Sequence, residues 1–385
     1  MADVPRNSPT ANRRSRHRVR RTLLAGLAGL LLTGCGSTGG VGPVPRPVDP
    51  VSFPATPRVA ATPLPLGTAT PTPEPAPVEL RVMSFNVRHA DISARSAHHP
   101  DAREFQWTTS RGPAAVKYVR QADPDIIGFQ EVKPQMKGIK GQRIPGKMIT
   151  VLAGGLPAYT FTATPERNNF LPIAFKTGKF TLLDSGRIQI QYTTDKGSDS
   201  NRFATWAMLK VTQTGQRLLV ANLWANDGSR RYWAIGRALA WQRLLPALAD
   251  LTDDNQIPAI TLGDFNAVDD RDEYPFNAHL TAFPEAGWLD ASQAPVTLQK
   301  LPDVASYNGW GQKVDGVFRP NAIRTGPRLD YIWTHGGITP LTWQIFLPEI
   351  EYRTVDGRKL PFAKGTIPSD HWPVVADLAL PPAAH

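Results

Sequence analysis

Short apolar runs bounded by polar loops recur along the chain from residue 79 onward, and they show two different spacings. Runs rich in apolar and β-branched residues predict strands at residues 80–87, 125–129, 173–176, 204–211, 218–223, 259–262, 330–334 and 373–378. Apolar residues at helical spacing predict helices over residues 112–121 and 232–251. No internal repeat interrupts this order, so we expect one mixed α/β domain in which helices cover two stacked sheets.

The beginning of the chain lacks this pattern. An arginine-rich stretch precedes the apolar run "LLAGLAGLLL" at residues 23–32, which is too short to span a bilayer as a mature helix. The "LTGC" that follows resembles a bacterial lipobox, which implies a signal peptide over residues 1–34 and a lipidated Cys35. This predicts an extracytoplasmic lipoprotein held at a membrane by its lipid anchor. The alternative is an ordinary secretory signal with a chance cysteine, and the export route stays open.

A proline-rich segment connects this start to the domain. Residues 36–78 contain 12 of the 37 prolines, a composition typical of an extended tether without a core. We therefore expect the lipidated cysteine and a linker over residues 35–78, and a monomeric globular domain over residues 79–385. Because Cys35 is the only cysteine, the mature domain has no internal disulfide and no thiolate metal site.

The net charge does not indicate a partner. The formal charge of the whole chain is +10, but residues 1–34 contain seven arginines and one aspartate. The remaining 36 basic and 32 acidic residues leave a balance of about +4. Such a balance neither supports nor excludes a polyanionic partner such as nucleic acid.

Oxygen-bearing polar side chains and one histidine stand at the ends of several predicted strands. They are Asn86, Glu131, Asp264, Asn266, Asp330, Asp370 and His371. If the fold brings them together, they form an oxygen-rich cluster of the kind that Mg²⁺ and Mn²⁺ prefer. Each residue alone also has a structural explanation, since Asp-Phe-Asn after a glycine is typical of a capped turn and a lone acid is typical of a surface.

The ordered motifs "SFNV", "DIIGFQEV", "GDFNAV", "RLDYIW" and "PSDHWPV" resemble the endonuclease/exonuclease/phosphatase superfamily with the DNase-I-like fold. The resemblance covers about residues 79–380. It implies a four-layered α/β/β/α sandwich and Mg²⁺- or Mn²⁺-dependent attack of water on a phosphate ester. It also implies that Glu131 is a direct metal ligand, that Asn86 lies at the metal, and that Asp370 lies nearby as a further ligand.

The same resemblance implies the catalytic roles. Asp264 orients or deprotonates the attacking water, and Asn266 binds the scissile phosphate. His371 faces that phosphate and stabilises its developing charge, while Asp330 holds the orientation of the imidazole. These roles agree with ordinary acid–base and electrostatic catalysis.

One position departs from the family pattern. Family members usually carry a histidine in a motif close to Asn-Thr-His, whereas this chain has Trp224 there, and an indole can donate one hydrogen bond but cannot carry positive charge. Trp224 could still donate to a phosphate, as an aromatic residue does in the abasic-endonuclease branch, with Asn226 or Asp227 adding a polar contact. Alternatively, the activity is reduced or the substrate differs, or the domain only binds a phosphorylated ligand.

The expected function is therefore hydrolysis of phosphodiester bonds, with a nuclease as the first hypothesis. The same fold also supports phosphatases acting on sugars or inositols and phospholipid diesterases, and no motif separates these substrates. A catalytically silent phosphate-binding relative is the alternative from another class.

Overall fold

The computed structural model describes residues 77–89, 107–133, 135–137, 143–145, 147–162, 171–198, 200–268, 271, 273–295 and 297–383. The chain divides into two compact units, Met1–Thr70 and Pro71–His385, and every described residue belongs to the second unit. The predicted signal peptide, Cys35 and the linker up to residue 76 lie outside the described residues, so their assignments stay predictions. No helix among the described residues is long and apolar enough to cross a membrane.

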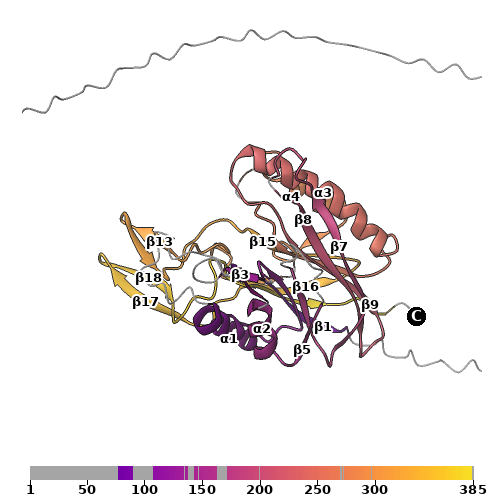
Figure 1. The fold of residues 1–385 in the computed structure, drawn as a ribbon, viewed down its shortest axis with the longest axis horizontal. Coiled ribbons are helices and arrows are strands. Elements are labelled where there is room, and N and C mark those ends of the chain that lie inside the picture. Colours follow the sequence, from indigo (N-terminus) through magenta and orange to yellow (C-terminus); the bar gives the residue numbers. More distant parts are fainter. Residues whose placement is uncertain are drawn as a thin grey trace, which may run out of the picture. The chain divides into compact units, whose positions relative to one another are not determined.

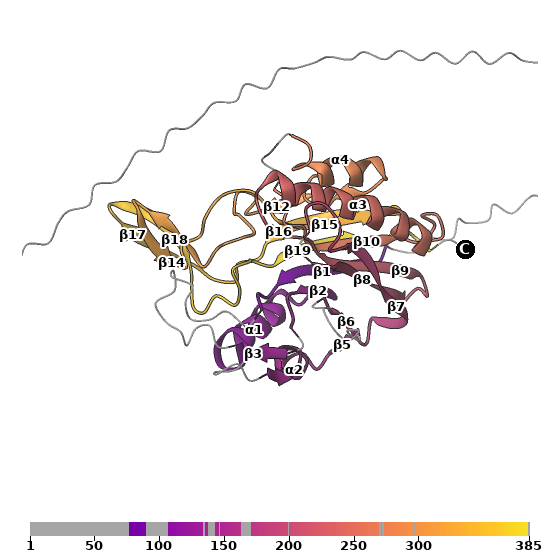
Figure 2. The same cartoon turned by 45° about the horizontal axis from the view of Figure 1, so that its top comes forward.

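Two stacked mixed sheets form the centre of the second unit (Figures 1 and 2). Within the described ranges, the first sheet runs in the order β12 (Leu298–Lys300), β16 (Thr339–Ile345), β19 (Val374–Ala379), β1 (Glu79–Asn86), β2 (Ile126–Gln130), β6 (Ile173–Lys176) and β5 (Tyr159–Phe161). The second sheet runs in the order β11 (Leu289–Asp290), β15 (Asp330–His335), β10 (Ala259–Asp264), β9 (Arg217–Trp224), β8 (Arg202–Val211) and β7 (Phe180–Gln191).

Helices cover the outer face of each sheet (Figures 1 and 2). A π-helical turn, Trp107–Arg111, leads into α1 (Gly112–Ala122), which packs with α2 (Lys147–Gly155) on the first sheet. On the second sheet, α3 (Arg231–Leu251) packs with α4 (Ala278–Glu285). The α/β/β/α layering expected from the sequence is confirmed, and the eight predicted strands and two predicted helices are present with ends shifted by one or two residues.

Alternation along the strands of the second sheet builds two cores. Leu218 and Val220 of β9 face the first sheet, whereas Leu219 and Leu223 belong to the apolar cluster under the helices. The same alternation holds in β10, where Ile260 and Leu262 face inward and Ala259 faces outward. Side chains at the ends of these strands therefore point either toward the first sheet or toward the helices.

Strand direction brings the candidate residues to one edge. In the first sheet β1 runs parallel to β2 and antiparallel to β19, so the end of β1, the end of β2 and the start of β19 share an edge. In the second sheet β10 runs parallel to β9 and antiparallel to β15, with Asp264 paired to both Trp224 and Asp330. By the alternation just described, these three side chains lie on the inner face.

The two sheets approach closely beside this edge. Gly128 of β2 faces Leu262, and a β-carbon there would lie 1.9 Å from a methyl carbon of Leu262 and 2.9 Å from the amide of Asn222. Forcing extra atoms into a packed core costs about 1–3 kcal/mol or more. The glycine therefore permits the sheet-to-sheet spacing at which residues from both sheets can meet.

The hairpins were not predicted from the sequence. They are β13 (Gly311–Val314) with β14 (Val317–Pro320), β17 (Ile350–Val355) with β18 (Arg358–Ala363), and β3 (Gln135–Lys137) with β4 (Arg143–Pro145). The first two lie side by side and project from the sandwich (Figures 1 and 2), joined by a bridge between Ala322 and Phe362 and by an ion pair between Arg358 and Asp315. We call these two hairpins, residues 311–320 and 350–363, the hairpin lobe.

Candidate active site

Asn86 connects the two sheets at the shared edge. It is fully buried at the end of β1, and its side-chain amide donates to Glu131 Oε1 at 3.1 Å and to Asp264 Oδ2 at 2.9 Å. Its own oxygen accepts a hydrogen bond from the backbone N–H of Arg88 at 2.9 Å. The structure therefore brings three of the predicted residues, from both sheets, into direct contact.

Glu131 contacts two side chains from the loop after β1. Its carboxylate accepts from the backbone N–H of His89 at 3.1 Å, contacts the His89 ring, and lies 3.5 Å from the Arg88 guanidinium. Burial alone would raise the pKa of Glu131, but the hydrogen bond from His89 and the charge of Arg88 outweigh it and lower the pKa below its usual range. Glu131 is therefore a fixed buried carboxylate.

Arg88 also reaches Asp370, with 3.5 Å between Nε and Oδ2. Burial raises the pKa of Asp370, and the neighbouring charge of Glu131 adds to this, while His371 and Arg88 oppose it. Glu131 and Asp370 thus share one guanidinium. We call Glu131, Asp370, Arg88 and His89 the glutamate half of the site.

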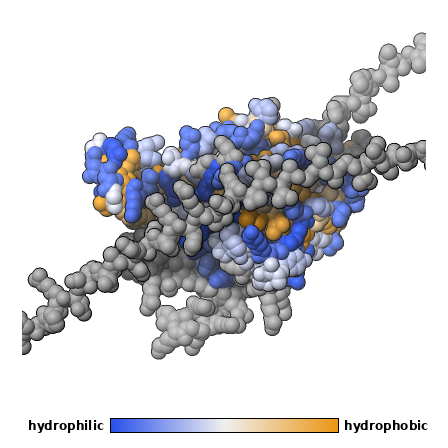
Figure 3. Space-filling model, turned by 90° about the horizontal axis from the view of Figure 1, so that it is seen from above, coloured by the Kyte–Doolittle hydropathy of each residue, from blue (hydrophilic) through white to orange (hydrophobic). Residues whose placement is uncertain are grey.

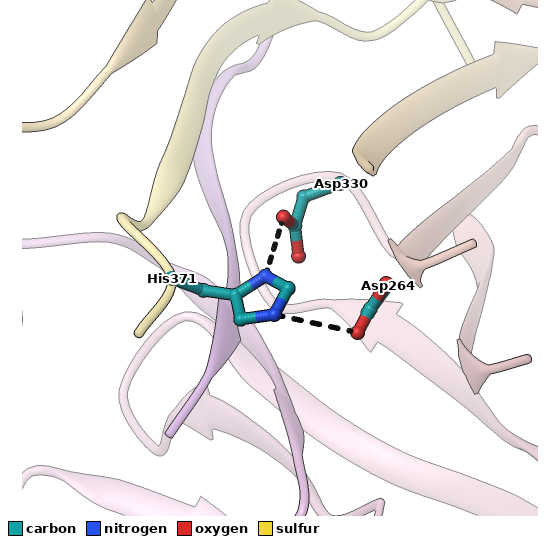
Figure 4. A group of neighbouring side chains, drawn as sticks. All are labelled: Asp264, Asp330 and His371. Carbon is teal, nitrogen blue, oxygen red and sulfur yellow. Dashed lines mark hydrogen bonds and ion pairs between the residues drawn. The ribbon is translucent and has the colours of Figure 1, made fainter. Parts of the chain in front are cut away.

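His371 joins two aspartates (Figure 4). Its Nδ1 lies 2.9 Å from Asp330 Oδ2, and its Nε2 lies 3.8 Å from Asp264 Oδ2 on the other side of the ring. The first contact is a hydrogen bond that fixes the ring, whereas the second distance is too long for one. We call these three residues the histidine half of the site.

Burial and charge shift the titration of the histidine half. Burial raises the pKa of Asp264 to about 7, with Asp330 adding to the rise and His371 opposing it. Burial would lower the pKa of His371, but the carboxylates of Asp330 and Asp264 outweigh it and raise the pKa to about 10. A protonated imidazole between two carboxylates is the arrangement that these shifts favour.

Asp264 and Asn266 belong both to a capped turn and to the polar cluster, the two possibilities that the sequence left open. The strand ends at Asp264, and Asn266 adopts a left-handed backbone with φ of 48°. Asp264 Oδ1 caps the turn by accepting from the Asn266 N–H at 2.9 Å. The turn also places the Asn266 amide 3.2 Å from Asp264 Oδ2, and Phe265 between them is fully buried.

Trp224 stacks with a cation from the neighbouring strand β8. The Arg202 guanidinium lies 4.1 Å from the centre of a Trp224 ring, and its Nε donates to Asn226 Oδ1 at 3.1 Å. Asn226 is fully buried and also donates to the carbonyl of Gly197 at 2.9 Å. Asn226 thus positions Arg202, and direct contact of Asn226 with a substrate stays a prediction.

Arg111 holds the loops that carry the site. Arg111 stands directly before α1, is fully buried, and donates to the carbonyls of Val87, Arg88 and Pro368 at 3.0–3.1 Å. Burial lowers its pKa to about 10. Because these carbonyls belong to the loops on either side of the glutamate half, Arg111 fixes their spacing.

The residues fit a divalent cation. Asp264, Asp330 and His371 offer ligand atoms within 4.8 Å of one another, so this buried group could hold a metal ion. Glu131, Asp264, Asp330 and Asp370 are each no more than 5% exposed. Buried carboxylates require compensating positive charge, and carboxylate and amide oxygens are the ligands that hard divalent cations prefer.

Comparison with known proteins identifies the family. Residues 83–371 match the family described as Endonuclease/Exonuclease/phosphatase family. No curated sequence matches the chain closely enough to serve as a relative. The chain therefore belongs to the endonuclease/exonuclease/phosphatase family and is a metal-dependent phosphoester hydrolase.

Solved structures agree with this fold. An endonuclease/exonuclease/phosphatase family protein from Bacteroides thetaiotaomicron is 20% identical, with a TM-score of 0.58 over 79% of this chain and 99% of that one. A mannosyl-6-phosphatase from the same species is 20% identical, with a TM-score of 0.56 over 78% and 100% of the two chains. TDP2 from D. rerio, complexed with a single-strand DNA product, is 18% identical, with a TM-score of 0.51 over 78% and 98%. At these identities the similarity establishes the fold alone.

Proposed function

We propose that the protein is a Mg²⁺- or Mn²⁺-dependent phosphodiesterase that cleaves nucleic acid outside the cytoplasm, attached to a membrane through lipidated Cys35. The observation that carries the catalytic part is the buried contact between the two halves of the site through Asn86. Sugar phosphates and phospholipids are the other substrates that this family's chemistry accommodates, and the assay below includes them.

The glutamate half suits the cation. Glu131 and Asp370 supply carboxylate oxygens from two segments, with the Asn86 amide beside Glu131, and Mg²⁺ commonly uses one or two carboxylates together with substrate oxygens. Arg88 now provides positive charge there and His89 donates a hydrogen bond, and both are partly exposed, at 34% and 21% of their side chains. We infer that both side chains move away from Glu131 when the cation binds. The bound cation would then neutralise charge on the phosphate.

The histidine half suits proton transfer and charge stabilisation. Asp264 is positioned by Asn86 and by the Asn266 backbone to accept a proton from water. The Nε2 side of His371 faces away from its Asp330 hydrogen bond, so an N–H there can donate to a phosphate oxygen. Asp330 keeps the ring in that orientation, and Asn266 adds an amide beside Asp264.

Arg202 supports activity despite the missing histidine. Trp224 pairs with Asp264 across the neighbouring strands, so the Arg202 guanidinium stacked on Trp224 brings positive charge to this end of the sheet. A guanidinium is charged at all physiological pH values and binds phosphate in a bidentate manner. We infer that Arg202 and Trp224 together contact the phosphate, where other family members use the histidine.

The test of the enzymatic proposal is an assay of purified protein on plasmid DNA, RNA, a generic phosphodiester, a sugar phosphate and sphingomyelin. We expect turnover of the nucleic acids that requires Mg²⁺ or Mn²⁺, stops with chelator and disappears in Asp264→Asn. Turnover of sphingomyelin or the sugar phosphate alone would replace the nuclease by a lipid diesterase or phosphatase. Absence of turnover on the whole panel would refute an active enzyme and favour a phosphate-binding protein.

The lipid anchor has a separate test. Labelled fatty acid should be incorporated into the wild-type protein but not into Cys35→Ser, because only the cysteine thiol accepts the diacylglycerol. Equal membrane attachment of both proteins would contradict the anchor while leaving the enzymatic proposal untouched.

A further inference from the structure

A groove with polar and apolar walls lies along the β13–β14 hairpin of the hairpin lobe. It has a volume of about 410 Å³. Its walls come from the β13–β14 hairpin and from two neighbouring segments, and they include Tyr307, Gln312, Lys313, Phe318, Arg324 and Thr325. In the space-filling view the lobe shows hydrophilic residues with hydrophobic ones between them (Figure 3).

Tyr307 connects this groove to His371. Its ring lies edge-on to the imidazole, with 5.1 Å between the ring centres, and the backbones of the two residues form an antiparallel bridge. The backbone N–H groups of Asn308 and Gly309 donate to the carbonyl of Asp370 at 2.7 and 3.1 Å. The groove wall is therefore held at a fixed position beside the histidine half.

The groove carries positive charge. Lys313 and Arg324 line it, and its lining residues include no carboxylate. The nearby acids of the hairpin lobe are already paired, Asp315 with Arg358 and Asp356 with Arg319. Across the described residues, neither Lys313 nor Arg324 forms an ion pair. Two unneutralised cations at a concave surface attract an anion.

The other groups suit a phosphate joined to an organic part. Arg324 lies 5.9 Å from the Tyr307 ring centre, so the tyrosine ring supports the guanidinium while its hydroxyl remains a donor. Phe318 gives the opposite side an apolar surface. Gln312 is fixed by donating to the carbonyl of Ile323 at 2.9 Å.

We propose that this groove binds a second phosphate group of the substrate, next to the phosphate that is hydrolysed at His371. The proposal rests on the proposed phosphoesterase function and adds a preference to it. Lys313 and Arg324 bind the second phosphate, and Tyr307 separates it from the reacting one. Such a phosphate belongs either to a polynucleotide or to a bisphosphorylated small molecule.

The experiment compares substrates with one and two phosphates in the full-length protein. The pairs are the dinucleotide TpT against 5′-phosphorylated pTpT, and glucose 1-phosphate against glucose 1,6-bisphosphate. In Lys313→Gln/Arg324→Gln we expect KM for the two-phosphate member of one pair to rise about tenfold or more, with kcat unchanged. The one-phosphate member should keep its KM, and the pair that responds identifies the source of the phosphate.

Lys359→Gln is the matched control, because Lys359 lies on the same lobe but contacts the ring of exposed Tyr352. It should leave both KM values unchanged. Equal changes for one- and two-phosphate substrates, or no change in the double variant, would overturn the proposal.

Binding measurements test the groove independently of whether the protein is an active phosphoesterase. If no ester is hydrolysed, pTpT and glucose 1,6-bisphosphate remain intact, and calorimetry measures their affinity directly. Tighter binding of either compound than of its one-phosphate partner, lost in Lys313→Gln/Arg324→Gln, would support the groove in an inactive protein. Equal affinity within each pair would refute the groove even if the enzyme proves active.

Discussion

The two halves of the site differ in how their buried carboxylates are compensated. In the glutamate half, Glu131 and Asp370 face the partly exposed side chains of Arg88 and His89. In the histidine half, two aspartates share one imidazole, and all three side chains are almost completely buried. A partly exposed guanidinium can move into solvent and leave its carboxylates free for a metal ion. A buried imidazole held by Asp330 instead keeps one fixed position beside the phosphate. We therefore assign metal binding to the glutamate half and the fixed catalytic groups to the histidine half.

Removal of the imidazole should have the largest effect on activity. We expect His371→Ala to lower kcat by about 10³-fold, since it removes both the donor to the phosphate and the charge beside Asp264. Initial rates on the best phosphodiester from the substrate panel measure this loss. His335→Ala, at the other end of β15 from Asp330, is the control and should retain the wild-type rate. A His371→Ala rate within tenfold of wild type would mean that the histidine half does not perform the chemistry.

Substitutions in the glutamate half should change the affinity for the metal ion more than the rate of the chemical step. For Glu131→Gln we expect the Mn²⁺ affinity measured by calorimetry to fall about tenfold or more, because a neutral amide replaces a buried carboxylate ligand. Arg88→Met should act in the opposite direction, since its guanidinium competes for both Glu131 and Asp370.

Glu285→Gln serves as the control for this pair, because Glu285 is an exposed acid on α4. It should leave the Mn²⁺ affinity unchanged. Unchanged affinity in Glu131→Gln would place the cation elsewhere, with the group of Asp264, Asp330 and His371 as the remaining position. Weaker binding in Arg88→Met would show that Arg88 supports the cation rather than competing with it.

This contrast between the halves was only partly predictable from the sequence. The strand ends could be predicted because a polar group stands where each apolar run stops or starts. Asn86, Glu131 and Asp264 lie where runs stop, and Asp330 and His371 lie at or before the start of theirs. Arg88 and His89 carry no comparable signal, since they belong to a loop without periodicity and meet Glu131 only when β1 and β2 pair.

The missed features share this cause. The position of Arg202 could not be predicted from the sequence, because its stacking on Trp224 depends on the register between β8 and β9. The hairpin lobe was missed because its short strands are mostly exposed and lack the alternation of a strand with one buried face. Sequence patterns report burial against a core, whereas these contacts are made at the surface or between distant segments.

The Arg202–Trp224 pair should give the smallest effect and the finest test of how the site works without the usual histidine. We expect Arg202→Gln to lower kcat/KM about tenfold, because one charged donor to the phosphate is lost. Trp224→Phe keeps an aromatic face under the guanidinium and should cost less than about threefold. Arg187→Gln is the control, since Arg187 stacks on Phe203 of the same sheet in a similar way but is exposed. If Trp224→Phe proves as damaging as Arg202→Gln, the indole N–H contacts the phosphate as well, and Trp224 does more than support the guanidinium.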